Sequence, residues 1–319
     1  MTADDFGLAD EVNVAVEEAH RRGVLTSASL MVGAAAADDA LRRARALPSL
    51  RVGLHLVLVE GAPTLPAEQI PDLVDRAGRL RSDLVGLAVD IAGRPALRRQ
   101  LRAEIRAQFE SYARTGLVLE HVDVHKHFHL HPLVAREIIA IGSRFGMRAL
   151  RVPSEPVEVL RQIDGGAATL SARLIGAWAS LLRRQARGAG LLTPDAVFGL
   201  RWSGAMTEER LSGLLADLPS GLTEIYLHPA AGNHFAGHCP GYRYTDELAA
   251  LCAPRVAAAV EAAGCRLGGY AGCRSATTQQ RNPSEQRALP IVRRLARALH
   301  RDGLARRRRL RRDRSDQLG

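Results

Sequence analysis

Two short stretches of the chain concentrate residues that can bind a metal ion or move protons. The first, ADDFGL, places Asp4 next to Asp5. The second, HVDVHKHFHLHP, spaces five histidines and Asp123 along positions 121–131. Neither pattern stabilises a core, because buried carboxylates and imidazoles must be paired or ligated to offset their desolvation. The two stretches are therefore candidates for one functional site.

The histidine-rich stretch offers more ligands than one metal ion can use. Its polar residues occupy every second position, so in a continuous strand they would all face one way. A strand advances about 3.3 Å per residue, whereas bonds to zinc are only about 2.0–2.2 Å long. We expect His125 to be the ligand, with Asp123 and His127 beside it or facing the substrate. We expect His129 and His131 to begin the next helix or to lie on the surface.

Residues of ligand type also stand at the ends of other predicted strands. His55 lies inside GLHL, and His228 follows EIYL. A single histidine of this kind is most often a hydrogen-bonded core or surface residue. In parallel α/β folds, however, the loops at the carboxyl ends of the strands build the site. Because four strand ends carry such residues, we favour one shared site.

One carboxylate and two imidazoles would leave coordination positions open, as in a catalytic rather than a structural metal site. An open cation polarises a carbonyl oxygen and acidifies water. The second carboxylate of the Asp pair can remove a proton, and His228 can protonate a leaving group. This set is complete for metal-assisted hydrolysis of an amide or ester. Glycoside hydrolysis by paired carboxylates is an alternative, but it would leave the histidines without a role.

The spacing of apolar residues predicts alternating helices and strands over most of the chain. In residues 95–114, for example, apolar side chains recur every three or four positions, which is typical of an amphipathic helix. The alternation runs without a linker rich in Pro, Gly or Ser, and it predicts one α/β barrel-like domain over residues 1–274. The predicted helices are 8–23, 35–50, 95–114, 132–146 and 170–192, and the predicted strands are 24–33, 51–58, 121–125, 149–153 and 223–230.

The composition limits the class of protein. No apolar run is long enough to span a bilayer, which excludes an integral membrane protein. The four cysteines contain no CxxC pair, so we expect free thiols and a cytoplasmic location. The net charge is +10, of which residues 281–319 contribute +9, from 13 Arg and four acidic residues. The barrel-like domain is therefore nearly neutral.

Residues 275–319 are predicted to be a separate Arg-rich extension. Ile291, Leu295 and Leu299 would share one face of a helix, and a basic amphipathic helix of this kind can lie on an anionic membrane surface. A solvated, disordered tail is the other interpretation. The Arg run could also bind nucleic acid, which would make the chain a non-enzymatic protein. The scarcity of aromatic residues for base stacking speaks against nucleic acid.

Several motifs together resemble one known family. In chain order, ADDFGL, GVLTSASLMV, VGLHLVL, HVDVHKHFHLHP, EIYLHPA and CRLGGY are similar to the YdjC/ChbG-like carbohydrate deacetylases. The segments ALRVPSEP and FGLRWSGAMT resemble the hopanoid-biosynthesis-associated HpnK branch of that family. The resemblance covers residues 2–271 and excludes the tail. It implies a distorted (β/α) barrel that removes the acetyl group from an N-acetylated amino sugar.

The resemblance also implies roles for individual residues. The family's metal ligands map onto Asp5, His55 and His125, its general base onto Asp4 and its acid onto His228. The cofactor would be one divalent ion, Mg²⁺ or Zn²⁺. For the HpnK branch the implied substrate is a hopanoid lipid that carries an N-acetylglucosamine head group.

Two further expectations concern Asp4. Arg151 could keep Asp4 ionised by a charge-assisted hydrogen bond, or it could form an ordinary structural salt bridge.

Relatives usually carry an apolar strand before the Asp pair, whereas only residues 1–3 precede it here. We therefore expect a truncated first strand that leaves Asp4 and Asp5 on a frayed terminus, with a misassigned start as the hypothesis that would explain it.

Overall fold

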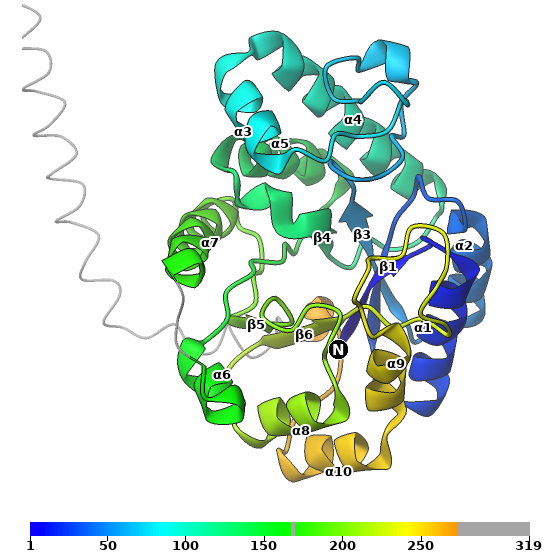
Figure 1. Cartoon of the computed structure of the whole chain (residues 1–319), viewed down its shortest axis with the longest axis vertical. Coiled ribbons are helices and arrows are strands. Elements are labelled where there is room, and N and C mark those ends of the chain that lie inside the picture. Colours follow the sequence, from blue (N-terminus) through cyan, green and yellow to red (C-terminus); the bar gives the residue numbers. More distant parts are fainter. Residues whose placement is uncertain (167–169, 274–319) are drawn as a thin grey trace, which may run out of the picture. The chain divides into compact units, whose positions relative to one another are not determined.

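The computed structural model describes residues 1–166 and 170–273, which form an α/β fold around one parallel sheet. The strands follow the order β4-β3-β2-β1-β6-β5, and all neighbours run parallel. They curl into a half-barrel with helices in a ring around it (Figure 1). The predicted barrel-like α/β fold is confirmed. The strands are β1 (Thr2–Phe6), β2 (Ser27–Leu30), β3 (Arg51–Leu56), β4 (Val122–Val124), β5 (Ala196–Phe198) and β6 (Thr223–Leu227).

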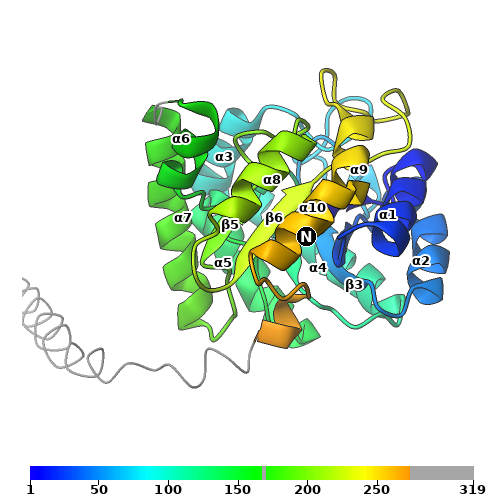
Figure 2. The same cartoon turned by 90° about the horizontal axis from the view of Figure 1, so that it is seen from below.

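The helices bury one apolar side against the sheet. The first of them buries Val12, Val16 and Ala19 and ends at Gly23, as the sequence predicts. Figure 2 shows α8 and α10 side by side next to β6. The α-helices are α1 (Asp10–Arg22), α2 (Ala37–Ala46), α3 (Leu84–Gly93), α4 (Pro95–Arg114), α5 (Pro132–Gly142), α6 (Val157–Asp164), α7 (Leu170–Gly188), α8 (Glu208–Ala216), α9 (Tyr244–Cys252) and α10 (Pro254–Ala262). The 3-10 helices are η1 (Ala67–Gln69), η2 (His125–Leu130), η3 (Ser143–Phe145) and η4 (Tyr270–Cys273).

The Asp pair does not lie on a frayed terminus, in contrast to the expectation from the sequence, while the truncation of the first strand stays a prediction. Asp4 and Asp5 lie inside β1, and all five residues of this strand are buried. β1 pairs with β2 on one side and with β6 on the other, so it is a central strand of the sheet. Thr2 and Ala3 pair with both neighbouring strands and Phe6 pairs with β2, so the residues on either side of the Asp pair are held in the sheet.

The sheet is open between β4 and β5, where the sequence predicts a strand over residues 149–153. In the described part of the chain this segment makes only isolated parallel bridges, Val122 with Leu150 and Ala149 with Leu192. Pro153 ends this segment and Pro156 follows soon after, and a proline has no N–H to donate to a ladder. The three-residue strand β5 was not predicted, because it is too short to show a periodic pattern.

The Arg-rich extension lies outside the described residues, so its helical or disordered character stays a prediction. Among the helices that the structure does describe, none combines the length and the apolar character needed to cross a bilayer. Cys239, Cys252 and Cys265 are free thiols, in agreement with the cysteine spacing.

Gly53 provides a test of the packing inside the sheet. A Cβ atom at this position of β3 would lie 2.4 Å from the ring of His121, which is fully buried. We expect Gly53→Ala to destabilise the protein by about 2 kcal/mol through overpacking. That loss corresponds to roughly 4–8 °C in Tm for a domain of this size. Gly176→Ala is the matched control, since nothing lies within 4 Å of its added Cβ on α7. Thermal unfolding that leaves Gly53→Ala as stable as the parent would contradict this packing.

Candidate active site

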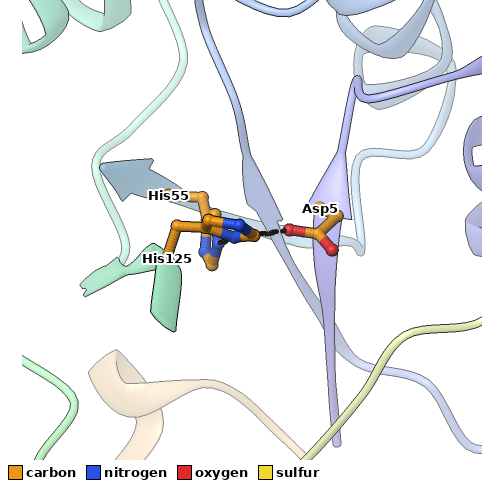
Figure 3. A group of neighbouring side chains, drawn as sticks. All are labelled: Asp5, His55 and His125. Carbon is orange, nitrogen blue, oxygen red and sulfur yellow. Dashed lines mark hydrogen bonds and ion pairs between the residues drawn. The ribbon is translucent and has the colours of Figure 1, made fainter. Parts of the chain in front are cut away.

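Three side chains from three different strands converge at the carboxyl end of the sheet. Asp5 comes from β1, His55 from β3, and His125 begins η2 directly after β4. The Oδ1 atom of Asp5 lies 3.3 Å from His55 Nε2 and 3.3 Å from His125 Nδ1. The two imidazole nitrogens are also 3.3 Å apart. Figure 3 shows the three side chains pointing toward one another. We call these residues the ligand triangle.

A bulge in β1 allows Asp4 and Asp5 to reach the same cavity. Adjacent residues of a regular strand point to opposite faces. Here the register of β1 against β2 shifts between Ala3 and Phe6, and Asp5 has a left-handed φ of 61°. Both carboxylates consequently line one cavity. Bulges and left-handed non-glycine residues are costly and concentrate at functional sites.

The histidine-rich stretch does not continue as a strand. Lys126 and His127 have φ values of 55° and 52°, so the chain turns sharply after His125. His127 lines the cavity, and its Nε2 atom lies 2.9 Å from the hydroxyl of Tyr226. His129 is buried, and its Nε2–H donates to the carbonyl of Arg151 at 2.8 Å. The stretch thus divides into groups that face the cavity and groups that support it.

The ligand triangle fits a divalent metal ion. Asp5 Oδ1 is buried, has no hydrogen-bond partner and faces the two imidazoles. A tetrahedral ion bonded at about 2.0–2.2 Å would separate its ligand atoms by about 3.3–3.6 Å, which matches the triangle. His55 Nδ1–H donates to Asp123 Oδ2 at 2.9 Å, so in the neutral ring it is Nε2 that presents its lone pair to the triangle. A carboxylate behind a metal-ligating histidine commonly fixes the ring in this way.

A second group of possible ligands shares His55 but fits an ion less well. Asp4, His55 and Asp123 offer donor atoms within 4.8 Å of one another. Arg151, however, pairs with both of these carboxylates, at 2.6 Å and 2.7 Å. Because the guanidinium of Arg151 already contacts the carboxylate oxygens of Asp4 and Asp123, the ligand triangle is the better candidate for a metal site.

Arg151 organises the polar groups beneath the triangle. It is fully buried and uses both sides of its guanidinium. Nη1 and Nη2 donate to the two oxygens of Asp4 at 2.6 and 2.8 Å. Nε and Nη2 donate to Glu224 at 3.0 and 2.9 Å, and Nη1 also lies 2.7 Å from Asp123 Oδ2. Four N–H groups of the side chain therefore donate to carboxylate oxygens, and Nη1 also forms an ion pair with Asp123.

Two of the three carboxylates next to Arg151, those of Asp4 and Asp123, have opposite pKa shifts. Burial raises the pKa of Asp4 to about 6, although Arg151 opposes the rise. Burial also disfavours the charge on Asp123, but Arg151 and His55 hold its pKa well below its usual range. One guanidinium cannot offset two buried charges fully, and only Asp123 has an imidazole at hydrogen-bond distance as well. A proton taken up by this pair therefore resides on Asp4.

Within the ligand triangle, the pKa values of His55 and Asp5 are shifted strongly and in opposite directions. Although burial disfavours the imidazolium, Asp123 and Asp5 raise the pKa of His55 well above its usual range. Although burial disfavours the carboxylate, His125 and His55 lower the pKa of Asp5 well below its usual range. Without an ion, the imidazolium of His55 thus compensates the carboxylates around it.

The ligand triangle opens into a cavity of about 610 Å³. His228, which follows β6, lines this cavity, and its backbone N–H donates to Glu247 of α9. Burial lowers the pKa of His228 to about 4, and its Nδ1 atom has no hydrogen-bond partner. The cavity lining also includes an ion pair between Lys126 Nζ and Glu60 Oε2, 3.0 Å apart. The cavity has room and polar groups for a sugar-sized ligand.

The structure brings together all the residues that the sequence analysis singled out. Asp4, Asp5, His55, His125, His127 and His228 line the cavity, while Asp123 and Arg151 lie behind it. Glu224 and Tyr226 were not predicted as site residues. Both share their parity on β6 with His228, and this alternation could have predicted that they face the same interior.

A model of the YdjC-like protein family matches residues 1–262 of the chain. The chain belongs to the YdjC-like family. The family-level resemblance seen in the sequence is confirmed, whereas the HpnK branch stays a prediction.

Three relatives are each named a carbohydrate deacetylase. The Geobacillus stearothermophilus relative is 31% identical over 273 residues, which covers 84% of this chain and 94% of that protein. The Mus musculus relative is 33% identical over 248 residues, covering 72% and 76%. The Brevibacillus brevis relative is 37% identical over 145 residues, and this chain matches only 55% of that protein's length.

A solved structure shares the fold. It is a crystal structure from Enterococcus faecalis V583 whose name proposes cellobiose-phosphate cleavage, and it matches with a TM-score of 0.66. The match covers 85% of this chain and 96% of that chain at 24% identity, so it bears on the fold alone.

Metal binding should depend on pH in a defined direction. The raised pKa of His55 means that the metal-free protein carries an imidazolium there at neutral pH. An ion needs the neutral ring, so its binding releases about one proton, and the apparent Zn²⁺ affinity should rise about tenfold per pH unit below that pKa.

Titration calorimetry between pH 6 and 8, in two buffers of different ionisation enthalpy, measures both quantities. His125→Ala should lose most of the affinity, while His131→Ala, outside the triangle, should retain it. Zinc binding without proton release would contradict the assignment of His55.

Proposed function

We propose that this protein is a metal-dependent deacetylase that removes the acetyl group from an N-acetylated amino sugar. The observation that carries the proposal is the ligand triangle of Asp5, His55 and His125, with the Asp4 carboxylate lining the same cavity. Family membership and the names of the relatives support deacetylation as the reaction.

Asp5, His55 and His125 would bind the ion, and two imidazoles with one carboxylate suit Zn²⁺ better than Mg²⁺. When bound, a divalent ion would polarise the acetamide carbonyl and acidify water at the site. The 3.3 Å separations also favour a tetrahedral ion, because octahedral Mg²⁺ would hold neighbouring ligand atoms about 2.8–3.0 Å apart. We therefore propose zinc as the working ion, with magnesium as the alternative.

Asp4 is the proposed general base. With a pKa of about 6 it is mostly ionised at pH 7 and can still accept a proton. Arg151 binds one lone pair on each Asp4 oxygen and fixes the carboxylate plane, which leaves further lone pairs to accept a proton from the attacking water. The pairing thus orients the base, although it also makes the base weaker.

His228 is the proposed acid for the departing nitrogen. Its pKa of about 4 makes the free imidazole neutral at pH 7, so it can donate only after it has received a proton. The proton lost by the attacking water, passed on by Asp4, is the available source. The carbon–nitrogen bond then breaks as the nitrogen takes this proton, and the products are the free amine and acetate.

The specific substrate that we propose is an N-acetylglucosaminyl hopanoid lipid. Its support is the resemblance of ALRVPSEP and FGLRWSGAMT to the HpnK branch. A lipid-linked substrate would also give the Arg-rich extension a role, in peripheral contact with an anionic membrane surface.

Acetate release tests this function. The purified protein with Zn²⁺ should release acetate from an N-acetylglucosaminyl lipid or from a chitin oligosaccharide, and excess chelator should abolish the release. Asp4→Asn should lower kcat by about 10²- to 10⁴-fold, the usual contribution of a general base. Asp217→Asn, an exposed residue at the end of α8, is the control and should keep full activity.

The two substrates distinguish deacetylation of amino sugars in general from deacetylation of a hopanoid lipid. A preference for the lipid supports the hopanoid assignment, and a preference for the oligosaccharide rejects it while deacetylation stands. Activity that survives the chelator would contradict a metal-dependent enzyme.

A further inference from the structure

The last described segment of the chain packs into the barrel at the end opposite the cavity. Tyr270 of η4 is buried, and its hydroxyl donates a hydrogen bond to Glu224 Oε2. Its ring stacks on His121 with the centroids 5.1 Å apart and the planes at 17°. The backbone N–H of Ala271 donates to Glu120 Oε1 at 2.9 Å. None of these residues lines the cavity.

Glu224 connects this segment to Arg151. Its carboxylate is buried and accepts four hydrogen bonds, two on each oxygen. Oε1 accepts from Thr2 Oγ1 at 2.8 Å and from Arg151 Nη2 at 2.9 Å. Oε2 accepts from Arg151 Nε at 3.0 Å and from the Tyr270 hydroxyl. Together, these donors hold the Glu224 carboxylate in one orientation.

The planar guanidinium of Arg151 transmits that orientation to Asp4. One edge is bidentate to Glu224, and the adjacent edge is bidentate to Asp4. Because the group is rigid and its five N–H vectors are fixed in one plane, a rotation of Glu224 displaces the hydrogen bonds on the Asp4 side as well.

We propose that Tyr270 and Glu224 are positioning residues for the deacetylase reaction, acting on Asp4 through Arg151. The inference rests on the proposed function in one respect, namely the role of Asp4 as the base. It assigns the C-terminal segment of the barrel, which touches neither the ligand triangle nor the cavity, to the alignment of the catalytic carboxylate.

Tyr270→Phe tests the proposal because it removes one hydroxyl and keeps the ring that stacks on His121. Glu224 then lacks one donor in a buried place, and its carboxylate turns to recover a partner. We expect kcat to fall about tenfold, as for other small misplacements of a catalytic group, with KM within about twofold. Tyr112→Phe is the matched control, since this buried hydroxyl donates to the Val52 carbonyl at 2.8 Å, away from Arg151. It should leave kcat unchanged.

A double-mutant cycle separates positioning from general destabilisation. In an Asp4→Asn background, Tyr270→Phe should cause no further loss of kcat, because the base it aligns is already absent. A tenfold loss that persists in that background would overturn the proposal, as would a Tyr270→Phe enzyme with parental kcat. An equal loss in Tyr112→Phe would also overturn it.

Crystal structures of the parent and of Tyr270→Phe provide a readout that does not need activity. If the parent protein releases no acetate, the proposed function fails on its own, and the two structures still decide the positioning claim. Loss of one Arg151–Asp4 hydrogen bond in Tyr270→Phe supports it, and unchanged bidentate geometry overturns it.

Discussion

The site depends on one buried guanidinium. Arg151 is fully buried, and a charge in such a place is tolerated only when its partners replace the water it has lost. Those partners are Asp4, Asp123 and Glu224, which come from three different strands. The same contacts that make the guanidinium tolerable thus fix the proposed base and the carboxylate behind His55. Removing Arg151 would leave three buried carboxylates without their counter-ion, so its structural and functional roles cannot be separated.

The balance of charge connects this core to the ligand triangle. Asp4, Asp123 and Glu224 surround the guanidinium, and Asp5 in the ligand triangle is a fourth buried carboxylate. In the metal-free protein the raised pKa of His55 supplies a second positive charge. A divalent ion would replace that proton and offset the carboxylates more completely, which explains how a cluster so rich in carboxylates can remain buried. The backbone contributes as well, since the bulge at Asp5 and the left-handed residues after His125 aim the ligands at one point.

Much of this arrangement could be predicted from the sequence because it follows local patterns. Apolar spacing placed α1 and α4, and ligand-type residues at strand ends singled out His55, His125 and His228. The Asp pair was expected on a frayed terminus because only residues 1–3 precede it, and only the pairing of β1 with β2 and β6 explains why it is buried. Glu224 and Tyr270 could not be predicted because Glu224 pairs with Arg151 and Tyr270 pairs with Glu224, and these partners are distant from one another in sequence.

The most direct test of this account is a crystal structure of the zinc-loaded protein with anomalous data collected at the zinc edge. The account predicts one strong peak bonded to Asp5 Oδ1, His55 Nε2 and His125 Nδ1, with Arg151 still bidentate to Asp4 and to Glu224. A peak among Asp4, His55 and Asp123 instead, or full zinc occupancy with Asp5 unbound, would contradict it. The first of these results would also mean that Arg151 does not reserve Asp4 for proton transfer.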